Sequence, residues 1–515
     1  MILFLLAILP IIFLILAFTK LKMTGHVGCS IAMFIAIVEA LFIWRQNFLE
    51  VLTGTLEGFV MAIWPICLVI VAAVFTYNLV VHTKNIDVIK NILASVSEDK
   101  RVLILIIAWG FGGFMEGMAG FGTAVAIPAG ILIGLGFEPV FAAMICLVAN
   151  TTPVAFGSIG VPEITAAAIG GVSSHQIAIY TIIQTAIMSI VVPFILLYMT
   201  GKNSNQKVSD TFKGMFMITF FSGLSFVIFQ YLTAAYISAE IPSVTGAVAS
   251  MLVTIFIAKV FKINNEKFKL KVEKQESSVT LKQGVVACSP FILVLVFLIM
   301  TSSFFPCINK PLSLVKSSIM IYTGEGAVPY TFSWLSTPGV QIIIAGMIGG
   351  FIQKCSFGEI VKVFFKTIVQ MSKTMITIMS VIATAKVMGY SGMIQVIADC
   401  VVGTTGNFYP FVAPFLGSIG TFVTGSATSS AVLFTKLQCS AAEVLMKNPA
   451  WFIAANVLGS TAGKIISPQN IAVATAATNT VGKESEMLTG VIKYYVLFII
   501  VYGVIVYLGT DIFVG

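Results

Sequence analysis

Residues 112–162 read GGFMEGMAGFGTAVAIPAGILIGLGFEPVFAAMICLVANTTPVAFGSIGVP, a stretch rich in glycine and interspersed with polar side chains. The chain on both sides of this stretch is almost wholly apolar. In a bilayer, irregular backbone leaves polar groups unpaired, so it persists only where protein or a water-filled cavity supports it. Small residues alone would indicate close packing of helices, but close packing does not account for Glu116. An ionisable residue at membrane depth indicates a functional site.

The composition of the whole chain predicts an all-α polytopic membrane protein. Its 515 residues are 58% hydrophobic and 10% charged, and the mean hydropathy is +1.03. Soluble domains carry about 25% charged residues. The opening residues 1–22 lack a basic segment and a small-residue cleavage site, so we read them as a first transmembrane helix and not as a signal peptide.

The charged and metal-binding residue types exclude several other classes. A net charge of +8 would suggest nucleic acid in a soluble protein, but here the lysines lie in loops between apolar spans. The positive-inside rule explains that distribution, so no nucleic-acid partner is expected. The eight cysteines form no CxxC pair, and His26, His82 and His175 lie far apart. We expect these histidines at helix ends or interfaces, and we expect no metal, disulfide framework or cofactor.

Apolar stretches of about 20 residues are long enough to cross a membrane. Such stretches cover 2–19, 24–44, 57–80, 175–199, 213–235, 241–262, 285–305, 338–355, 361–388 and 488–514. Two further regions, 101–172 and 409–480, are interrupted by glycine, proline or polar residues. With these two regions, the chain is predicted to have about 12–14 transmembrane segments.

The lysines set the expected orientation, because loops rich in Lys and Arg stay on the cytoplasmic side. The loop 262–282 carries six lysines, and other basic loops follow the spans 2–19, 57–80 and 175–199. With those loops inside, the segment 306–337 and both chain termini are predicted outside. Arg45 is the exception, since it follows the second span on the outer side.

The chain also repeats itself, as a diverged duplication would. FMEGMA (114–119) resembles FVTGSA (422–427) at an offset of 308, and Ala149, Asn150, Gly157 and Pro162 match Ala455, Asn456, Gly463 and Pro468 at an offset of 306. The expected orientation makes span 57–80 enter from outside and its partner 361–388 enter from inside, so the halves are inverted. Inverted repeats with broken helices at matching positions are typical of secondary transporters, which bind substrate near the midplane. We expect residues 1–200 to form the first repeat, 201–284 the link with the basic loop, and 285–515 the second repeat.

Each half offers a glycine-rich loop followed by an Asn-containing break that ends in proline. A helix broken at mid-membrane exposes N–H groups and the positive end of its dipole, which suit a carboxylate. The candidate substrate-binding residues are Gly120, Phe121, Gly122, Thr123, Asn150, Thr151, Thr152 and Ser158 in the first half, and Thr424, Gly425, Ser426, Thr428, Ser429, Ser430, Asn456, Lys464, Ser467 and Gln469 in the second. The hydroxyl groups of 424–430 could instead satisfy their own helix backbone.

Four ionisable residues raise the question of coupling. A buried ammonium needs a counter-charge or a ligand, so Lys464 is expected to attract an anionic substrate, to pair with Glu116 or Glu163, or to snorkel to the cytoplasmic face. Lys386, late in a long apolar span, poses the same question. Glu116 and Glu163 are the acidic residues best placed to take up a proton, because burial favours the neutral carboxyl. Glu116, Glu163 and Lys386 are the candidates for proton or ion coupling.

At these residues the sequence resembles the L-lactate permease family. The matching stretches are EGMAGFG (116–122), ILIGLGFEPVFAA (131–143), CLVANTTPVAFGSIGVP (146–162), TGSATSS (424–430) and AANVLGSTAGKIISPQNIAVA (454–474). The resemblance covers nearly the whole chain. It implies a proton-coupled symporter for lactate, glycolate or another 2-hydroxymonocarboxylate in a bacterial inner membrane. It also implies kinship with a wider ion-transporter superfamily, whose members move a domain with two hairpins like an elevator, often as homodimers.

The second glycine-rich loop departs from the family pattern. The family reads TGSDTSSN there, and this chain has Ala427 and Ala431 in place of Asp and Asn. Glu163 and Lys386 depart from the pattern as well. Alternatives within the carrier class are therefore a short-chain fatty acid or a dicarboxylate as substrate, and Na⁺ in place of H⁺.

Two other classes compete with a carrier. An anion channel would pass currents far above carrier turnover. An enzyme would need a clustered Ser/His, HExxH or Asp-pair constellation, and the sequence has none. We therefore expect a carrier and not an enzyme: it moves a small monocarboxylate with a cation by alternating access, since net charge crosses a bilayer only at high cost.

Overall fold

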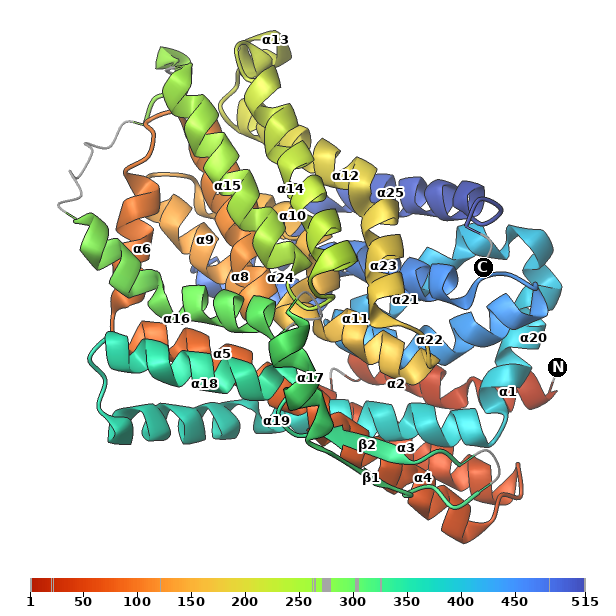
Figure 1. Ribbon diagram of the computed structural model, residues 1–515. Coiled ribbons are helices and arrows are strands. Elements are labelled where there is room, and N and C mark those ends of the chain that lie inside the picture. Colours follow the sequence, from red (N-terminus) through yellow and green to blue (C-terminus); the bar gives the residue numbers. More distant parts are fainter. Residues whose placement is uncertain are drawn as a thin grey trace.

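The computed structural model describes residues 2–19, 21, 23–120, 122–261, 263, 265–270, 279–301, 305–324, 327–480 and 482–513 (Figure 1). Within these residues the only strands are β1 (Lys316–Ile319) and β2 (Tyr330–Ser333), which pair antiparallel as a hairpin. The rest is helices and their connections, as the composition predicts. Part of the predicted basic loop 262–282 lies outside the described residues.

The first part of the chain, up to Asn203, is a series of helices with several interruptions. They are α1 (Ile2–Ala7), α2 (Leu9–Thr19), α3 (Gly25–Phe42), α4 (Phe48–Met61), η1 (Ala62–Cys67), α5 (Leu68–His82), α6 (Asn85–Ala94), α7 (Lys100–Ile104), η2 (Leu105–Phe111), α8 (Gly112–Met118), α9 (Thr123–Gly134), α10 (Pro139–Ala149), η3 (Thr152–Phe156), α11 (Gly157–Gly170) and α12 (Ser174–Asn203).

The remainder is built in the same way. The next segment, 208–268, holds α13 (Val208–Phe212), α14 (Phe216–Tyr236), α15 (Pro242–Val260) and η4 (Glu266–Phe268). It is followed by α16 (Leu281–Met300), α17 (Pro306–Leu314), α18 (Pro338–Ile352), α19 (Phe357–Tyr390), α20 (Met393–Thr405), η5 (Gly406–Phe408), α21 (Tyr409–Thr424), α22 (Ala427–Val444), α23 (Pro449–Ile466), α24 (Pro468–Ala477) and α25 (Glu484–Gly509).

In the described part of the chain, nine helices are long and apolar enough to cross a membrane, which confirms a polytopic all-α membrane protein. Two predicted spans differ in detail. The span 2–19 is divided between α1 and α2, next to Pro10, whose ring nitrogen donates no hydrogen bond. The span 57–80 begins earlier, at Phe48, and bends at Trp64, where the backbone leaves helical geometry before Pro65.

Four helix breaks lie in the two regions that the sequence marks as interrupted. In the first, α8 gives way to α9 around Gly122, whose φ is +84°, and α10 gives way to α11 through η3. In the second, α21 gives way to α22 around Gly425, whose φ is +71°, and α23 gives way to α24 at Ser467. Positive φ favours glycine, which has no Cβ to clash. Each region thus contains two helix breaks in the same order. The inverted relation of the halves stays a prediction.

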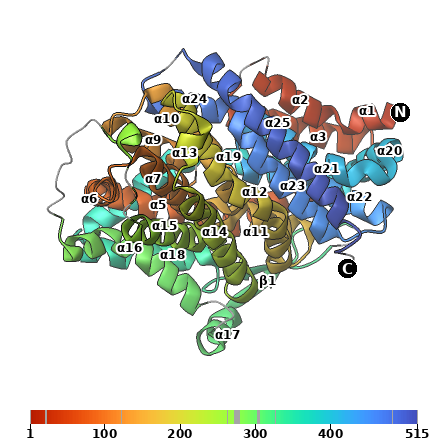
Figure 2. The same cartoon turned by 90° about the horizontal axis from the view of Figure 1, so that it is seen from above.

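Helix α23 lies at the centre of one side of the bundle. It is buried over most of its length, from Ala450 to Ile465, and packs against α12, α21, α22 and α25. Figure 2 shows α25 running beside α21 and α23. A helix that is apolar or small on all faces is buried on all faces, so α23 carries Lys464 into the interior of the bundle.

The chain termini and the flanks of the basic loop lie at opposite ends of the bundle. Both termini and α20 lie on the right of Figure 1, whereas α6 and the end of α15 that leads into 262–282 lie on the left. The flanks of the basic loop therefore lie on the opposite side of the bundle from both termini. Which end faces the cytoplasm stays a prediction.

Candidate functional site

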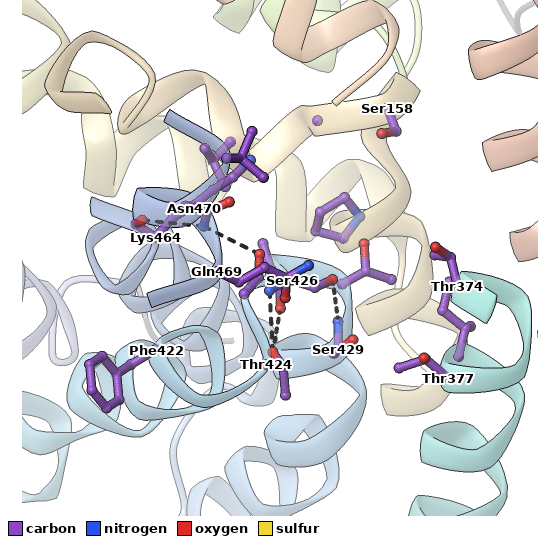
Figure 3. A pocket seen from close by; sticks show the side chains of 18 of the residues that line it. Ser158, Thr374, Thr377, Phe422, Thr424, Ser426, Ser429, Lys464, Gln469 and Asn470 are labelled. Carbon is purple, nitrogen blue, oxygen red and sulfur yellow. Dashed lines mark hydrogen bonds between the residues drawn. The ribbon is translucent and has the colours of Figure 1, made fainter. Parts of the chain in front are cut away.

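A polar cavity of about 520 Å³ lies where the broken helices meet α19. Its polar lining residues come from eight helices and the breaks beside them, and they are Thr24, His26, Glu116, Ser158, Lys373, Thr374, Thr377, Thr424, Ser426, Thr428, Ser429, Lys464, Gln469 and Asn470. Figure 3 shows Thr374 and Thr377 on one side of the cavity and Lys464 with Asn470 on the other. Both interrupted regions of the sequence thus contribute to one site.

An ion pair forms the deepest charged feature of this cavity. Lys464 Nζ lies 2.6 Å from Glu116 Oε1, and Asn150 Nδ2 donates to Glu116 Oε2 at 2.9 Å. The side chains of Lys464 and Glu116 are only 10% and 3% exposed. Of the three outcomes expected for Lys464, the structure shows pairing with Glu116. Removing one partner of a buried pair costs about 3–5 kcal/mol, because the other charge is left uncompensated.

Small residues and a helix end hold the pair in place. Gly157 packs against Glu116, and a Cβ at that position would come within 2.6 Å of Glu116 Oε1. Ser158 Oγ donates to the carbonyl oxygen of Ala119 at 2.9 Å, which ties the start of α11 to the end of α8. Lys464 lies in the last turn of α23, where the helix dipole favours a cation.

The hydroxyl groups of the second glycine-rich loop divide into two sets. Thr424 Oγ1 donates to the Gly420 carbonyl at 2.7 Å, Ser430 Oγ donates to the Gly417 carbonyl at 2.6 Å, and Ser426 Oγ accepts from the N–H of Ser429. These three hydroxyls form hydrogen bonds with nearby backbone groups. This is the alternative role that the sequence left open for the hydroxyls of 424–430. The hydroxyls of Thr428 and Ser429 line the cavity and bond to no residue that the structure describes. They are free to bind a ligand beside the first turn of α22.

Several predicted residues lie behind the cavity wall. Those that do not line it are Gly120, Gly122, Thr123, Asn150, Thr151, Thr152, Ser430, Asn456 and Ser467, and Phe121 lies outside the described residues. Thr123 Oγ1 donates to the Gly120 carbonyl at 2.7 Å, and Asn456 Nδ2 reaches the Ser430 carbonyl at 3.4 Å. Asn150 does not line the cavity but donates a hydrogen bond to Glu116, which does. The buried hydroxyls of Thr152 and Ser467 have no hydrogen-bond partner among the described residues.

The structure does not bring Glu163 and Lys386 to this cavity. Glu163 is fully buried in α11, and neither of its carboxylate oxygens has a hydrogen-bond partner among the described residues. Lys386 Nζ lies 2.8 Å from Glu57 Oε1 and lines a different cavity. Glu116 is thus the one predicted coupling residue that contacts Lys464.

Sequence reasoning missed the wall that α19 contributes. Lys373, Thr374 and Thr377 line the cavity from a span that reads as an ordinary apolar crossing. The sequence does contain a signal for this wall, which is the spacing of its three polar residues. Residues three or four apart are neighbours on a helix, so these side chains share one face of α19. His26 lies in the first turn of α3, a helix end as expected, but it also lines the cavity.

Fold and site together define a polytopic α-helical membrane protein built around a polar cavity that contains an ion pair. The chain belongs to the L-lactate permease family, whose model matches residues 3–513. Members of this family are transporters and not enzymes, which confirms the class and family predicted from the motifs.

Named relatives agree with the family. The chain is 46% identical to L-lactate permease of Streptococcus iniae, an alignment that covers 87% of this chain and 93% of that protein. It is 34% identical to glycolate permease GlcA of Escherichia coli (strain K12), with 99% and 96% covered, and 33% identical to the L-lactate permease of the same strain, with 97% and 94% covered.

Among solved structures, the chain resembles MtrF of Neisseria gonorrhoeae, which belongs to a class of antimetabolite efflux pumps. The TM-score is 0.53 at 12% identity, over 95% of this chain and 96% of that one. At this identity the likeness shows a shared fold alone.

Proposed function

We propose that this transporter carries a small 2-hydroxymonocarboxylate, L-lactate or glycolate, across the bacterial plasma membrane in symport with H⁺. The observation that carries the proposal is the Lys464–Glu116 ion pair at 2.6 Å in the wall of a polar cavity. Relatives named for L-lactate and glycolate support the substrate class.

The ion pair explains how a proton and an anion are coupled. In the empty site, Glu116 supplies the counter-charge of Lys464. A proton on Oε1 of Glu116 removes that counter-charge, and the substrate carboxylate then takes its place on the ammonium. Asn150 continues to donate to Oε2, the oxygen that stays unprotonated. Binding of the anion to Lys464 therefore requires that Glu116 is protonated.

The exchange leaves the buried pair without net charge in both states. In the empty site, this pair consists of the ammonium of Lys464 and the carboxylate of Glu116, while the exposed ammonium of Lys373 lies at the cavity wall in both states. The loaded site holds the ammonium, a neutral Glu116 and the carboxylate of the substrate. Because an unpaired charge inside a bilayer is costly, both states can pass through the membrane barrier, and the ratio is one proton for each monocarboxylate.

The remaining polar groups suit the rest of the substrate. The free hydroxyls of Thr428 and Ser429 lie at the start of α22, where N–H groups of the first turn have no partner within the helix. Across the cavity, Thr374 and Thr377 offer two more hydroxyls. These groups can bind a second carboxylate oxygen and a 2-hydroxyl group without any further charge.

The broken helices support alternating access. Their matching order in the two halves supports an inverted repeat, with residues 1–200 and 285–515 as the halves and 201–284 as the link. We propose that both termini lie outside the cell. The unit that contains the helix breaks then moves across the membrane in the manner of an elevator. It does so in a single chain or in a homodimer. Glu163, which forms no ion pair with any residue that the structure describes, is assigned no part in coupling.

Uptake by the purified protein in proteoliposomes tests this function. L-lactate uptake should rise with an inward proton gradient and should be inhibited by glycolate. Uptake that ignores pH and follows a Na⁺ gradient would contradict proton coupling.

A further inference from the structure

A second cavity lies at the other ends of three helices that line the first. It has a volume of about 630 Å³, and α11, α19 and α22 line both cavities. At about 1.5 Å of rise per residue, Lys386 in the second cavity lies roughly 13 Å along α19 from Thr377 in the first. Lys436 lies roughly 10 Å along α22 from Ser429 by the same measure. The two cavities are therefore consecutive along the same helices.

The partition between the cavities is packed. On α22, residues 430–435 are all buried. On α19, Ile378 lines the first cavity, Ile382 lines the second, and Ser380 and Val381 between them are buried. The helices α11 and α22 pack against each other along this partition. The structure thus separates two polar spaces by about one helical turn of buried side chains.

The second cavity repeats the ion-pair arrangement of the first. Lys386 Nζ lies 2.8 Å from Glu57 Oε1, and Tyr390 donates its hydroxyl to Glu57 Oε2 at 2.7 Å. The side chains of Lys386 and Glu57 are 18% and 8% exposed. In both cavities, a lysine late in the chain binds one oxygen of a glutamate early in the chain, and a neutral donor binds the other oxygen.

The second cavity also holds a cation that is not paired. Lys436 is half-buried and forms no ion pair with any residue that the structure describes. The other titratable groups that line the cavity beside the pair are Tyr330, Tyr390, Cys439 and Glu443. Glu443 is exposed, seven residues from Lys436 along α22. A half-buried ammonium in the same cavity as a buried ion pair is a site that a carboxylate fits.

We propose that the second cavity is a second binding site for a small monocarboxylate, held by Lys386 and Lys436 at the opposite end of the substrate pathway. The inference rests on the proposed function, because it assigns to Glu57 and Lys386 the same exchange that Glu116 and Lys464 perform. If Glu57 and Lys386 instead only fastened α4 to α19, the cavity would bind no anion.

Equilibrium binding of radiolabelled L-lactate to the purified full-length protein tests the proposal. The wild type is expected to bind two lactates per chain. K436Q should weaken one of them about tenfold or more, because it removes a charged hydrogen-bond donor. K464Q should remove the other. K282Q, an exposed lysine that lines neither cavity, is the matched control and should keep both.

A double variant guards against a folding defect. Replacing Lys386 alone leaves Glu57 buried without its cation, which is destabilising, so E57Q/K386Q removes both charges together. That variant is expected to bind one lactate, lost in turn when K464Q is added.

Two results would overturn the second site and leave the proposed function standing. One is a single lactate per chain in the wild type, abolished by K464Q. The other is two lactates per chain, neither weakened by K436Q nor by E57Q/K386Q. Two sites that both survive K464Q would instead contradict the proposed function.

Discussion

Lys464 and Glu116 are 348 residues apart in the chain, and their charged atoms lie 2.6 Å apart in the fold. Each comes from a helix that ends next to a break, α23 and α8. Two interrupted regions that look similar in sequence thus contribute opposite charges to one pair.

Gly157 leaves room for the carboxylate of Glu116. In G157A, the new Cβ would come within 2.6 Å of Glu116 Oε1 and displace it from Lys464. Lactate uptake is expected to fall by about tenfold, the effect of roughly 1.4 kcal/mol. The control is G130A, because a Cβ at Gly130 would meet nothing within 4 Å. Equal initial rates of uptake in the two variants would show that the position of Glu116 is not critical.

The free hydroxyl of Thr428 is expected to recognise the 2-hydroxyl group of the substrate. T428V keeps the shape of the side chain and removes the hydroxyl, so inhibition of uptake by lactate should weaken about two- to tenfold, the range of a single hydrogen bond. Inhibition by propionate, which lacks the 2-hydroxyl, should change less. T435V is the control on the same helix, since Thr435 is buried and donates to the Ala431 carbonyl at 2.6 Å. A proportionate loss for both acids would assign Thr428 to the carboxylate.

Close packing of α21 on α23 supports the lysine. Gly459 faces the carbonyl group of Pro414, and an added Cβ would overlap it. Overpacking a core costs about 1–3 kcal/mol, so G459A should lower the melting temperature of the protein in detergent. The control is G403A on α20, where an added Cβ would meet no atom within 4 Å, and this variant should keep the melting temperature of the wild type. A melting temperature for G459A equal to that of the wild type would mean that the two helices can separate without cost.

Arg101 fastens α13 to the start of α7. It is 1% exposed, its Nη2 lies 2.7 Å from Asp99 Oδ2, and its Nη1 donates to the Thr211 carbonyl at 3.0 Å. R101A leaves Asp99 buried and unpaired, which should destabilise the protein by about 3–5 kcal/mol. K267A breaks only the exposed pair with Asp210 and should cost about 0–1 kcal/mol. Thermal melting of the two variants side by side checks this difference, and equal losses would contradict it.

The sequence predicts the breaks well because they are local. Gly122, Gly425 and Pro468 mark backbone that cannot continue a helix, and the structure breaks its helices next to each of them. Which side chains meet across those breaks is a matter of tertiary packing. Pairing of Lys464 with Glu116 was one of three alternatives that the residues left open, and only the fold distinguishes them.

The wall from α19 lay beyond sequence reasoning for the same reason. Lys373 and Thr377 belong to a continuous helix with no break, so nothing local points to a site. Lys386 shows the opposite case. Its charge within an apolar span is correctly read as requiring a partner, but that partner, Glu57, lies on α4 and belongs to the second cavity.

Glu116→Gln tests the central claim most directly, because glutamine has the shape of the protonated acid and cannot release a proton. The measurement is made in proteoliposomes and compares lactate counterflow with accumulation driven by a proton gradient, with E486Q, an exposed glutamate on α25, as the control. The exchange at Lys464 predicts that E116Q keeps counterflow and loses proton-driven accumulation. Accumulation that persists at the level of E486Q would contradict it.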